Sequence, residues 1–78
     1  MTNIHTEINK KIGKKIKLER IKRDFSQEKL AELSGISKNF VGAIERGESS
    51  PTIETLAKIA NAFDIPLPDL TDISKVEI

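Results

Sequence analysis

The sequence contains no cysteine, no tryptophan and no tyrosine, and three phenylalanines are its only aromatic residues. Without cysteine, disulfides and thiolate metal sites are excluded, and the core must be built mainly from aliphatic side chains. No apolar run approaches the ~18 residues of a membrane-spanning helix, and the polar residues 1–5 lack the features of a signal peptide. We therefore expect a cytoplasmic protein.

The chain is also short. Its 78 residues leave room for a single domain, residues 1–78. Folding at this size buries only about 60% of the unfolded chain's surface. So thin a stability margin favours a helical bundle or an oligomer over a large sheet.

The residue sets typical of enzymes are missing as well. The only histidine, His5, falls in residues 1–7, which we expect to be a disordered leader. No set of serine, histidine and aspartate, and no clustered pair of carboxylates, has a suitable fold context. We therefore predict no enzymatic activity, no cofactor, no metal and no small-molecule ligand.

Charge is distributed unevenly along the chain. Residues 1–23 carry eight lysines and arginines against two glutamates, whereas residues 24–78 carry five basic and ten acidic side chains. Such polarity indicates either a basic surface for a partner or a solvated lysine-rich helix face. A membrane-surface helix is the less favoured reading, because the isoleucines of this segment are expected to close the core. These are Ile8, Ile12, Ile16 and Ile21.

Caps and periodicity predict an all-α fold, a compact five-helix bundle without strands. The first helix covers about 8–23 and ends at Asp24, a residue that tolerates left-handed backbone. Three helices start after N-cap residues, namely Ser26, Ser37 and Thr52, and two of these stop at glycines, Gly35 and Gly47. A short fifth turn is expected over residues 66–70, where proline suits a helix start.

The second and third helices, about 27–46, have the spacing of a helix-turn-helix. Four residues that include Gly35 separate them, and Ile36 is expected to plug the angle between the helices. In such motifs the second helix is offered to the major groove of DNA. Any small bundle with a corner between two helices would share this spacing. The residues of the third helix are therefore needed to distinguish a DNA-binding motif from an ordinary bundle.

The third helix, 37–46, has two faces when its residues are placed 100° apart. Phe40, Val41 and Ile44 form an apolar sector, and the opposite sector holds small and polar residues. Lysine and asparagine side chains pair with guanine and adenine edges, small residues permit close approach, and an arginine at the helix end suits a phosphate. This outward sector consists of Lys38, Asn39, Gly42, Ala43 and Arg46.

Two further side chains are expected to support this helix. Glu45 borders the apolar sector and needs a partner there, and Arg20 at the end of the first helix is the candidate for a structural ion pair. Gln27 opens the second helix, where free backbone N–H groups favour a phosphate. An ordinary exposed glutamine is the alternative for Gln27.

The combined motifs resemble the Cro/C1-type (XRE) helix-turn-helix family over about residues 12–70. They are Ser26-Gln27-Glu28-Lys29-Leu30-Ala31, Gly35-Ile36-Ser37, Ile44-Glu45-Arg46-Gly47-Glu48, Pro51-Thr52-Ile53-Glu54-Thr55-Leu56 and Ile59-Ala60. The resemblance implies a five-helix fold in which Gln27 and Ser37 touch phosphates, bases are faced by Lys38, Asn39 and Ala43, and Arg20 pairs with Glu45.

The stretch from Asn39 to Gly47 is similar to controller proteins of restriction–modification systems, which implies that Asn39 and Phe40 lie near bases. Two positions depart from the family pattern. Asp24 stands where glycine is usual, and the loop Glu48-Ser49-Ser50 lacks the basic residues that many members use on the DNA backbone.

The C-terminal segment, 65–78, is rich in apolar residues. A patch of this kind on so small a domain suggests a partner surface, and a symmetric dimer is the commonest solution. The expected interface consists of Ile65, Leu67, Leu70 and Ile73. The alternative is that Leu67 and Leu70 complete the monomer core while residues 73–78 fray.

Together these features predict a homodimeric regulator of transcription, a repressor or an activator, that binds a two-fold symmetric site in double-stranded DNA. The alternative is an antitoxin-type protein whose main role is to bind a toxin chain. Antitoxins usually carry an extra segment that wraps the partner, and the eight residues after Leu70 are few for that purpose.

Overall fold

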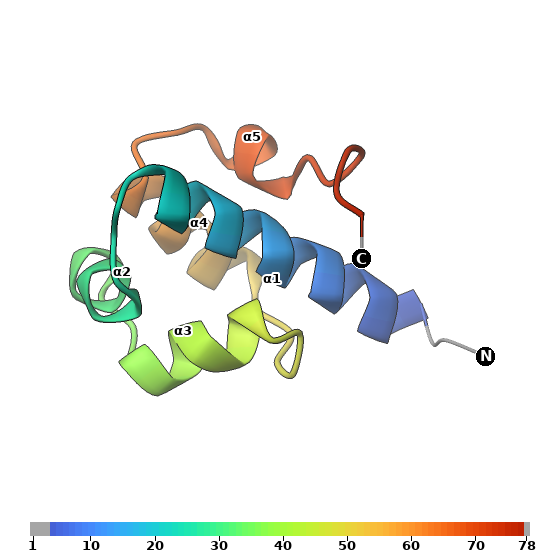
Figure 1. Ribbon diagram of the computed structural model, residues 1–78, viewed down its shortest axis with the longest axis horizontal. Coiled ribbons are helices and arrows are strands. Elements are labelled where there is room, and N and C mark those ends of the chain that lie inside the picture. The colour runs from blue at the N-terminus through green and yellow to red at the C-terminus, as the bar shows by residue number, and fades with distance from the viewer. Residues whose placement is uncertain (1–3, 78) are drawn as a thin grey trace.

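The computed structural model describes residues 4–77 and contains five α-helices and no strand within that range (Figure 1). The helices are α1 (Ile4–Lys22), α2 (Gln27–Ser34), α3 (Lys38–Glu45), α4 (Ile53–Ala62) and α5 (Leu67–Thr71). The described chain measures 36 × 23 × 22 Å along its principal axes. The predicted all-α fold of five helices is confirmed.

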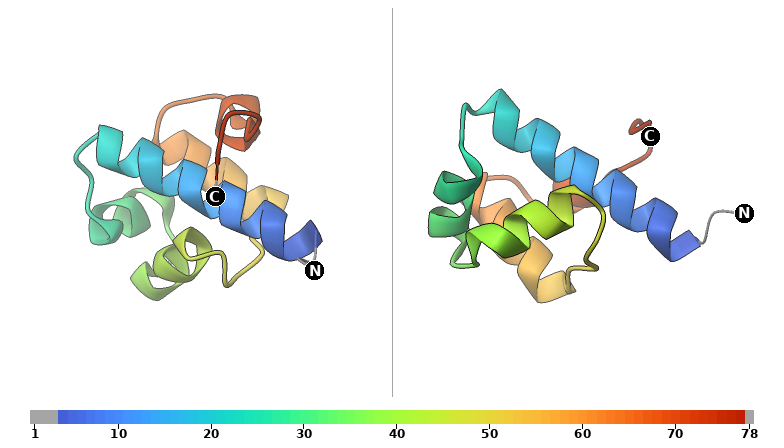
Figure 2. Two further views of the ribbon diagram at one scale, coloured as in Figure 1. Left: turned by 45° about the vertical axis from the view of Figure 1, so that its right-hand side comes forward. Right: turned by 60° about the horizontal axis from the view of Figure 1, so that its bottom comes forward.

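The long helix α1 crosses the whole molecule and packs on α3 along one side and on α5 along another (Figures 1 and 2). The motif helix α2 packs on both α3 and α4, and α4 packs on α5. This arrangement leaves α3 at the edge of the bundle, with one face toward the core.

The three expected N-caps form. The side-chain oxygens of Ser26, Ser37 and Thr52 each accept a hydrogen bond from the backbone N–H three residues later, at 2.9 to 3.1 Å. At the helix ends, Gly35 has φ +75° and Asp24 has φ +56°. The left-handed conformation predicted for Asp24 is therefore present, and Asp64 after α4 adopts a similar one (φ +58°).

The core is aliphatic, with one buried phenylalanine. Its buried members are Ile12, Ile16, Leu30, Ala31, Val41, Ile44, Leu56, Ile59, Ala60, Phe63 and Leu70. The expected isoleucine stripe on α1 is only half right, because Ile8 is 42% exposed and Ile21 is 51% exposed. At 100° per residue, Ile21 lies about 140° around the helix from buried Ile16, which turns it away from the core.

The first helix begins earlier than predicted. Residues 4–7 of the expected disordered leader are helical, so His5 lies in the first turn of α1. Glu7 supports this turn through an ion pair of 3.8 Å with Lys11, one turn later. Residues 1–3 lie outside the described part of the chain.

The C-terminal segment completes the core of its own chain. Leu70, expected at a dimer interface, is fully buried within the monomer, so it has no surface to offer a partner. Ile65, Leu67 and Ile73 are half-buried against the same core. The tail after α5 then folds back toward α1, where the Lys14 ammonium donates to the Glu77 carbonyl oxygen at 2.5 Å.

None of the helices in residues 4–77 is long and apolar enough to cross a bilayer.

Candidate nucleic-acid interface

Helices α2 and α3 form the predicted helix-turn-helix, joined by Gly35, Ile36 and Ser37 (Figure 1). Ile36 is half-buried and packs against the core between the helices. The buried hydroxyl of Ser34 donates to the Leu30 carbonyl oxygen at 2.6 Å, so it needs no further partner. The turn is therefore held both by packing and by satisfied polar groups.

The two faces of α3 agree with the helical wheel at most positions. Val41 and Ile44 are 1% and 0% exposed, whereas Lys38 and Asn39 are exposed and Ala43 is half-exposed. Phe40 is half-buried and packs against the edge of the core. Among the described residues, Lys38 and Asn39 make no side-chain hydrogen bond, so their polar atoms remain available to a ligand.

Arg20 and Glu45 form the ion pair that fixes α1 to α3. The guanidinium donates from Nε to Oε2 at 2.7 Å and from Nη2 to Oε1 at 3.0 Å, while Nη1 donates to the Phe25 carbonyl oxygen at 2.8 Å. The Glu45 side chain is only 3% exposed. The hydrogen bonds that Arg20 donates to Glu45 raise the pKa of Arg20 above its ordinary value.

Gln27, predicted from the sequence as a phosphate contact, also belongs to this cluster through a hydrogen bond that the sequence did not predict. Its Nε2 donates to Glu45 Oε1 at 3.1 Å. One N–H of the amide is thereby engaged, while the second N–H and Oε1 remain free to meet a ligand. Glu45 thus orients a residue of α2 and a residue of α1 around the base of α3.

Gly13 is a structural residue that the sequence reasoning missed. A β-carbon at this position would overlap the Ile44 carbonyl oxygen and lie 2.8 Å from the Glu45 carbonyl oxygen. The backbones of α1 and α3 therefore touch at Gly13. A glycine amid an otherwise favourable helical sequence was the available signal.

Gly42 differs from its expected environment. It was placed on the open outward sector of α3, yet the residue is buried. The covering groups are the side chains of Arg46 and Gln27, which lie 2.9 and 3.7 Å from the position of a β-carbon on Gly42. Arg46 itself is exposed and its Nε donates to Glu48 Oε1 at 2.9 Å.

The basic residues of α1 separate into two groups. Lys15 and Arg23 form ion pairs with Glu19 at 3.1 and 2.7 Å, and hydrogen bonding from Arg23 lowers the pKa of Glu19. By contrast, Lys10 and Lys17 make no ion pair with any described residue. Both lie within about 60° of Gly13 around the helix, on the side that faces α3, so these two charges flank α3. Lys22 also makes no ion pair with a described residue, but it lies on the opposite side of α1, about 180° from Gly13.

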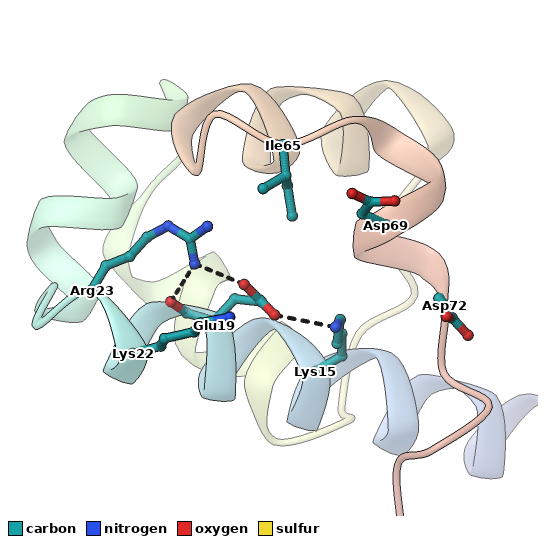
Figure 3. Close-up of a pocket in the computed structure, with 7 residues that line it drawn as sticks. All are labelled: Lys15, Glu19, Lys22, Arg23, Ile65, Asp69 and Asp72. Atoms are coloured by element: carbon teal, nitrogen blue, oxygen red, sulfur yellow. Dashed lines mark hydrogen bonds and ion pairs between the residues drawn. The ribbon is translucent and has the colours of Figure 1, made fainter.

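A polar pocket of about 300 Å³ lies between α1 and α5 (Figure 3). Its lining consists of Lys15, Glu19, Lys22, Arg23, Ile65, Asp69 and Asp72. The ion pairs around Glu19 occupy one wall, and hydrogen bonds from Ser74 lower the pKa of Asp72 at the rim. Because α3 packs along a different side of α1, this pocket is separate from the exposed face of α3.

Comparisons with known proteins agree with this geometry. A 64-residue stretch is 38% identical to the transcriptional repressor RstR of the cryptic phage CTXphi from Vibrio cholerae, covering 82% of this chain and 58% of that protein. A 47-residue stretch is 51% identical to the Escherichia coli transcriptional regulator SutR, covering 60% of this chain and 26% of that protein. The match thus spans less than two thirds of the length of each of these two curated relatives.

Among solved structures, the restriction–modification controller protein C.AhdI from Aeromonas hydrophila superposes with a TM-score of 0.78 at 35% identity. The match covers 80% of this chain and 94% of the controller protein. The family model described as "Helix-turn-helix" matches residues 16–70. That match covers α2, α3, α4, most of α5 and the C-terminal part of α1, so the chain belongs to the helix-turn-helix family of Cro/C1 (XRE) type that its sequence motifs resemble.

Proposed function

We propose that the protein binds double-stranded DNA in a sequence-specific manner and regulates transcription, with α3 inserted in the major groove. The observation that carries this proposal is the outward face of α3. Lys38 and Asn39 are exposed there and unpaired among the described residues, while the hydrogen bonds of Glu45 to Arg20 and Gln27 hold α3 against α1 and α2. Fixed backbone and free side chains are what base readout requires.

The base contacts are assigned to the first turns of α3. Lys38 can donate to guanine O6 and N7, and Asn39 can form a bidentate pair with adenine N6 and N7. Ala43 suits a thymine methyl group, and Phe40 lies next to Asn39 at the edge of the same face. These assignments follow from residue type and from position on the helix.

The phosphate contacts are assigned to residues around this face. Ser37 accepts from the Phe40 N–H, which leaves its own hydroxyl hydrogen for a phosphate oxygen. Gln27 keeps one amide N–H for the same purpose, and Arg46 carries a cationic group at the end of α3. Lys10 and Lys17 add positive charge along the flank and attract the duplex at longer range.

We further propose a homodimer that binds a two-fold symmetric site. Ile65, Leu67 and Ile73 are only half-covered by their own chain, so their remaining apolar surface can meet a second copy. Helix-turn-helix dimers place their reading helices about one turn of DNA apart. The relatives named as a repressor and a controller protein are consistent with such a role.

The test is selection of bound sites from random duplex DNA, with the Asn39→Ala, Lys38→Ala double variant as control. We expect the wild type to enrich a two-fold symmetric sequence with half-sites about 10 base pairs apart. The control should enrich no such sequence. Recovery of unrelated sequences by the wild type would reject sequence-specific binding.

A further inference from the structure

Gly42 lies in the middle of α3, and the side chain of Arg46 covers it. Arg46 Nη1 lies 2.9 Å from the position that a β-carbon on Gly42 would take. Side chains on a helix lean toward its N-terminus, over the residue one turn earlier. The side chain of Arg46 therefore extends naturally over residue 42, and the missing side chain there provides the space that the guanidinium occupies.

The guanidinium is also oriented at this position. Glu48 accepts a hydrogen bond from Nε at 2.9 Å, whereas the two terminal nitrogens make no hydrogen bond with the described residues. Nη1 and Gln27 Oε1 both lie close to Gly42, 2.9 and 3.7 Å from the same β-carbon position. Paired N–H donors of this kind match the oxygens of a phosphate group.

The fold itself does not require glycine at this position. A β-carbon would meet only the end of a flexible side chain, and alanine is the better helix former. Direct approach of DNA to the Gly42 backbone does not explain the glycine either, because Arg46 and Gln27 already cover it.

We propose that Gly42 is a positioning residue that seats the Arg46 guanidinium beside Gln27, where it binds a phosphate of the DNA backbone. This inference rests on the proposed DNA-binding function. With alanine at residue 42, the guanidinium is pushed off the face of α3 and that phosphate contact is lost.

A double-mutant cycle tests the proposal with wild type, Gly42→Ala, Arg46→Ala and the double variant. Binding is measured on the selected operator and on an unrelated duplex at several salt concentrations. We expect Gly42→Ala to weaken both DNAs by about 5- to 10-fold and to lower the salt slope as Arg46→Ala does. In the Arg46→Ala background, Gly42→Ala should not weaken DNA binding further. The thermal unfolding midpoint of the single Gly42→Ala variant should equal or exceed that of the wild type.

Three results would overturn the proposal that Gly42 positions Arg46. Gly42→Ala could weaken binding equally in both backgrounds, which would mean that DNA itself needs the space. It could weaken binding to the operator but not to the unrelated duplex, which would indicate a contact with bases, or it could leave both affinities unchanged. If the wild type binds no duplex, both the proposed function and the positioning role of Gly42 are rejected. If the wild type binds DNA and the effects of Gly42→Ala and Arg46→Ala are additive, only the positioning role is rejected.

Discussion

At the scale of single residues, the ion pair of Arg20 and Glu45 shows which contacts a helical wheel can predict. A carboxylate at the border of an apolar sector requires a cation, and Arg20 is near the end of the neighbouring helix, so the pair can be predicted. The hydrogen bond from Gln27 to the same carboxylate could not, because it depends on how closely α2 approaches α3. The periodicity of apolar residues does not give the distance between two helices.

The Arg20–Glu45 pair is expected to stabilise the fold as a unit. Arg20→Met and Glu45→Met should each lower the free energy of unfolding by about 3 kcal/mol, because each leaves a charge that is largely shielded from water without its partner. The double variant should recover part of this loss in urea titrations. Strict additivity of the two single effects would show that the side chains do not interact.

Gly13 should be sensitive to the addition of one carbon atom. Gly13→Ala places a β-carbon against the backbone carbonyls of Ile44 and Glu45, which have little freedom to move. We expect a loss of roughly 1–3 kcal/mol in the free energy of unfolding, despite alanine's better helix propensity. Gly42→Ala is the matched control, since it meets only a flexible side chain and should lose no stability. Equal behaviour of the two variants would contradict the close packing of α1 on α3.

At the scale of elements, caps explain why the helix bounds could be predicted at most ends. Ser26, Ser37 and Thr52 are local signals, and the hydrogen bonds that they accept come from residues three positions later. The start of α1 carried no such signal, and the sequence of residues 4–7 did not distinguish a leader from an exposed helical turn. The outer isoleucines of α1 were misplaced for a related reason, because periodicity alone does not give the width of a buried face.

The end of α1 offers a test of backbone conformation. Asp24 is exposed and has φ +56°, a region in which glycine carries no steric cost and β-branched residues carry a large one. Asp24→Gly should raise the free energy of unfolding by up to about 1 kcal/mol, and Asp24→Val should lower it by about 1–2 kcal/mol. Thermal unfolding of both variants measures this, and the opposite order of stability would rule out the left-handed turn.

At the scale of the whole molecule, the sequence indicated which segment could form the proposed dimer interface, but not which of its residues are exposed. Apolar composition marked the segment 65–78 as a partner surface, yet it did not separate Leu70, which completes the core, from Ile65, Leu67 and Ile73, which keep some exposure. Burial within the monomer depends on the packing of α5 against α4 and α1, which no local pattern records.

The dimer should dissociate when charge is placed on this half-exposed surface. Leu67→Asp and Ile73→Asp should each sediment as monomers and lose tight operator binding, because one domain alone buries little DNA surface. Circular dichroism should show that both variants keep their helices, whereas Leu70→Asp should unfold. A wild type that is monomeric well above the concentrations needed for DNA binding would exclude the dimer.

The central claim is that α3 reads base sequence, and Asn39 tests it most directly. Its exposed amide both donates and accepts, so it can distinguish adenine from guanine, and its removal leaves the phosphate contacts in place. The measurement is the affinity of Asn39→Ala and wild type for the selected operator and for an unrelated duplex at one salt concentration. We expect a loss of about 1–3 kcal/mol on the operator and little change on the unrelated duplex. An equal loss on both DNAs, or no loss on either, would contradict the assignment of α3 as the reading helix.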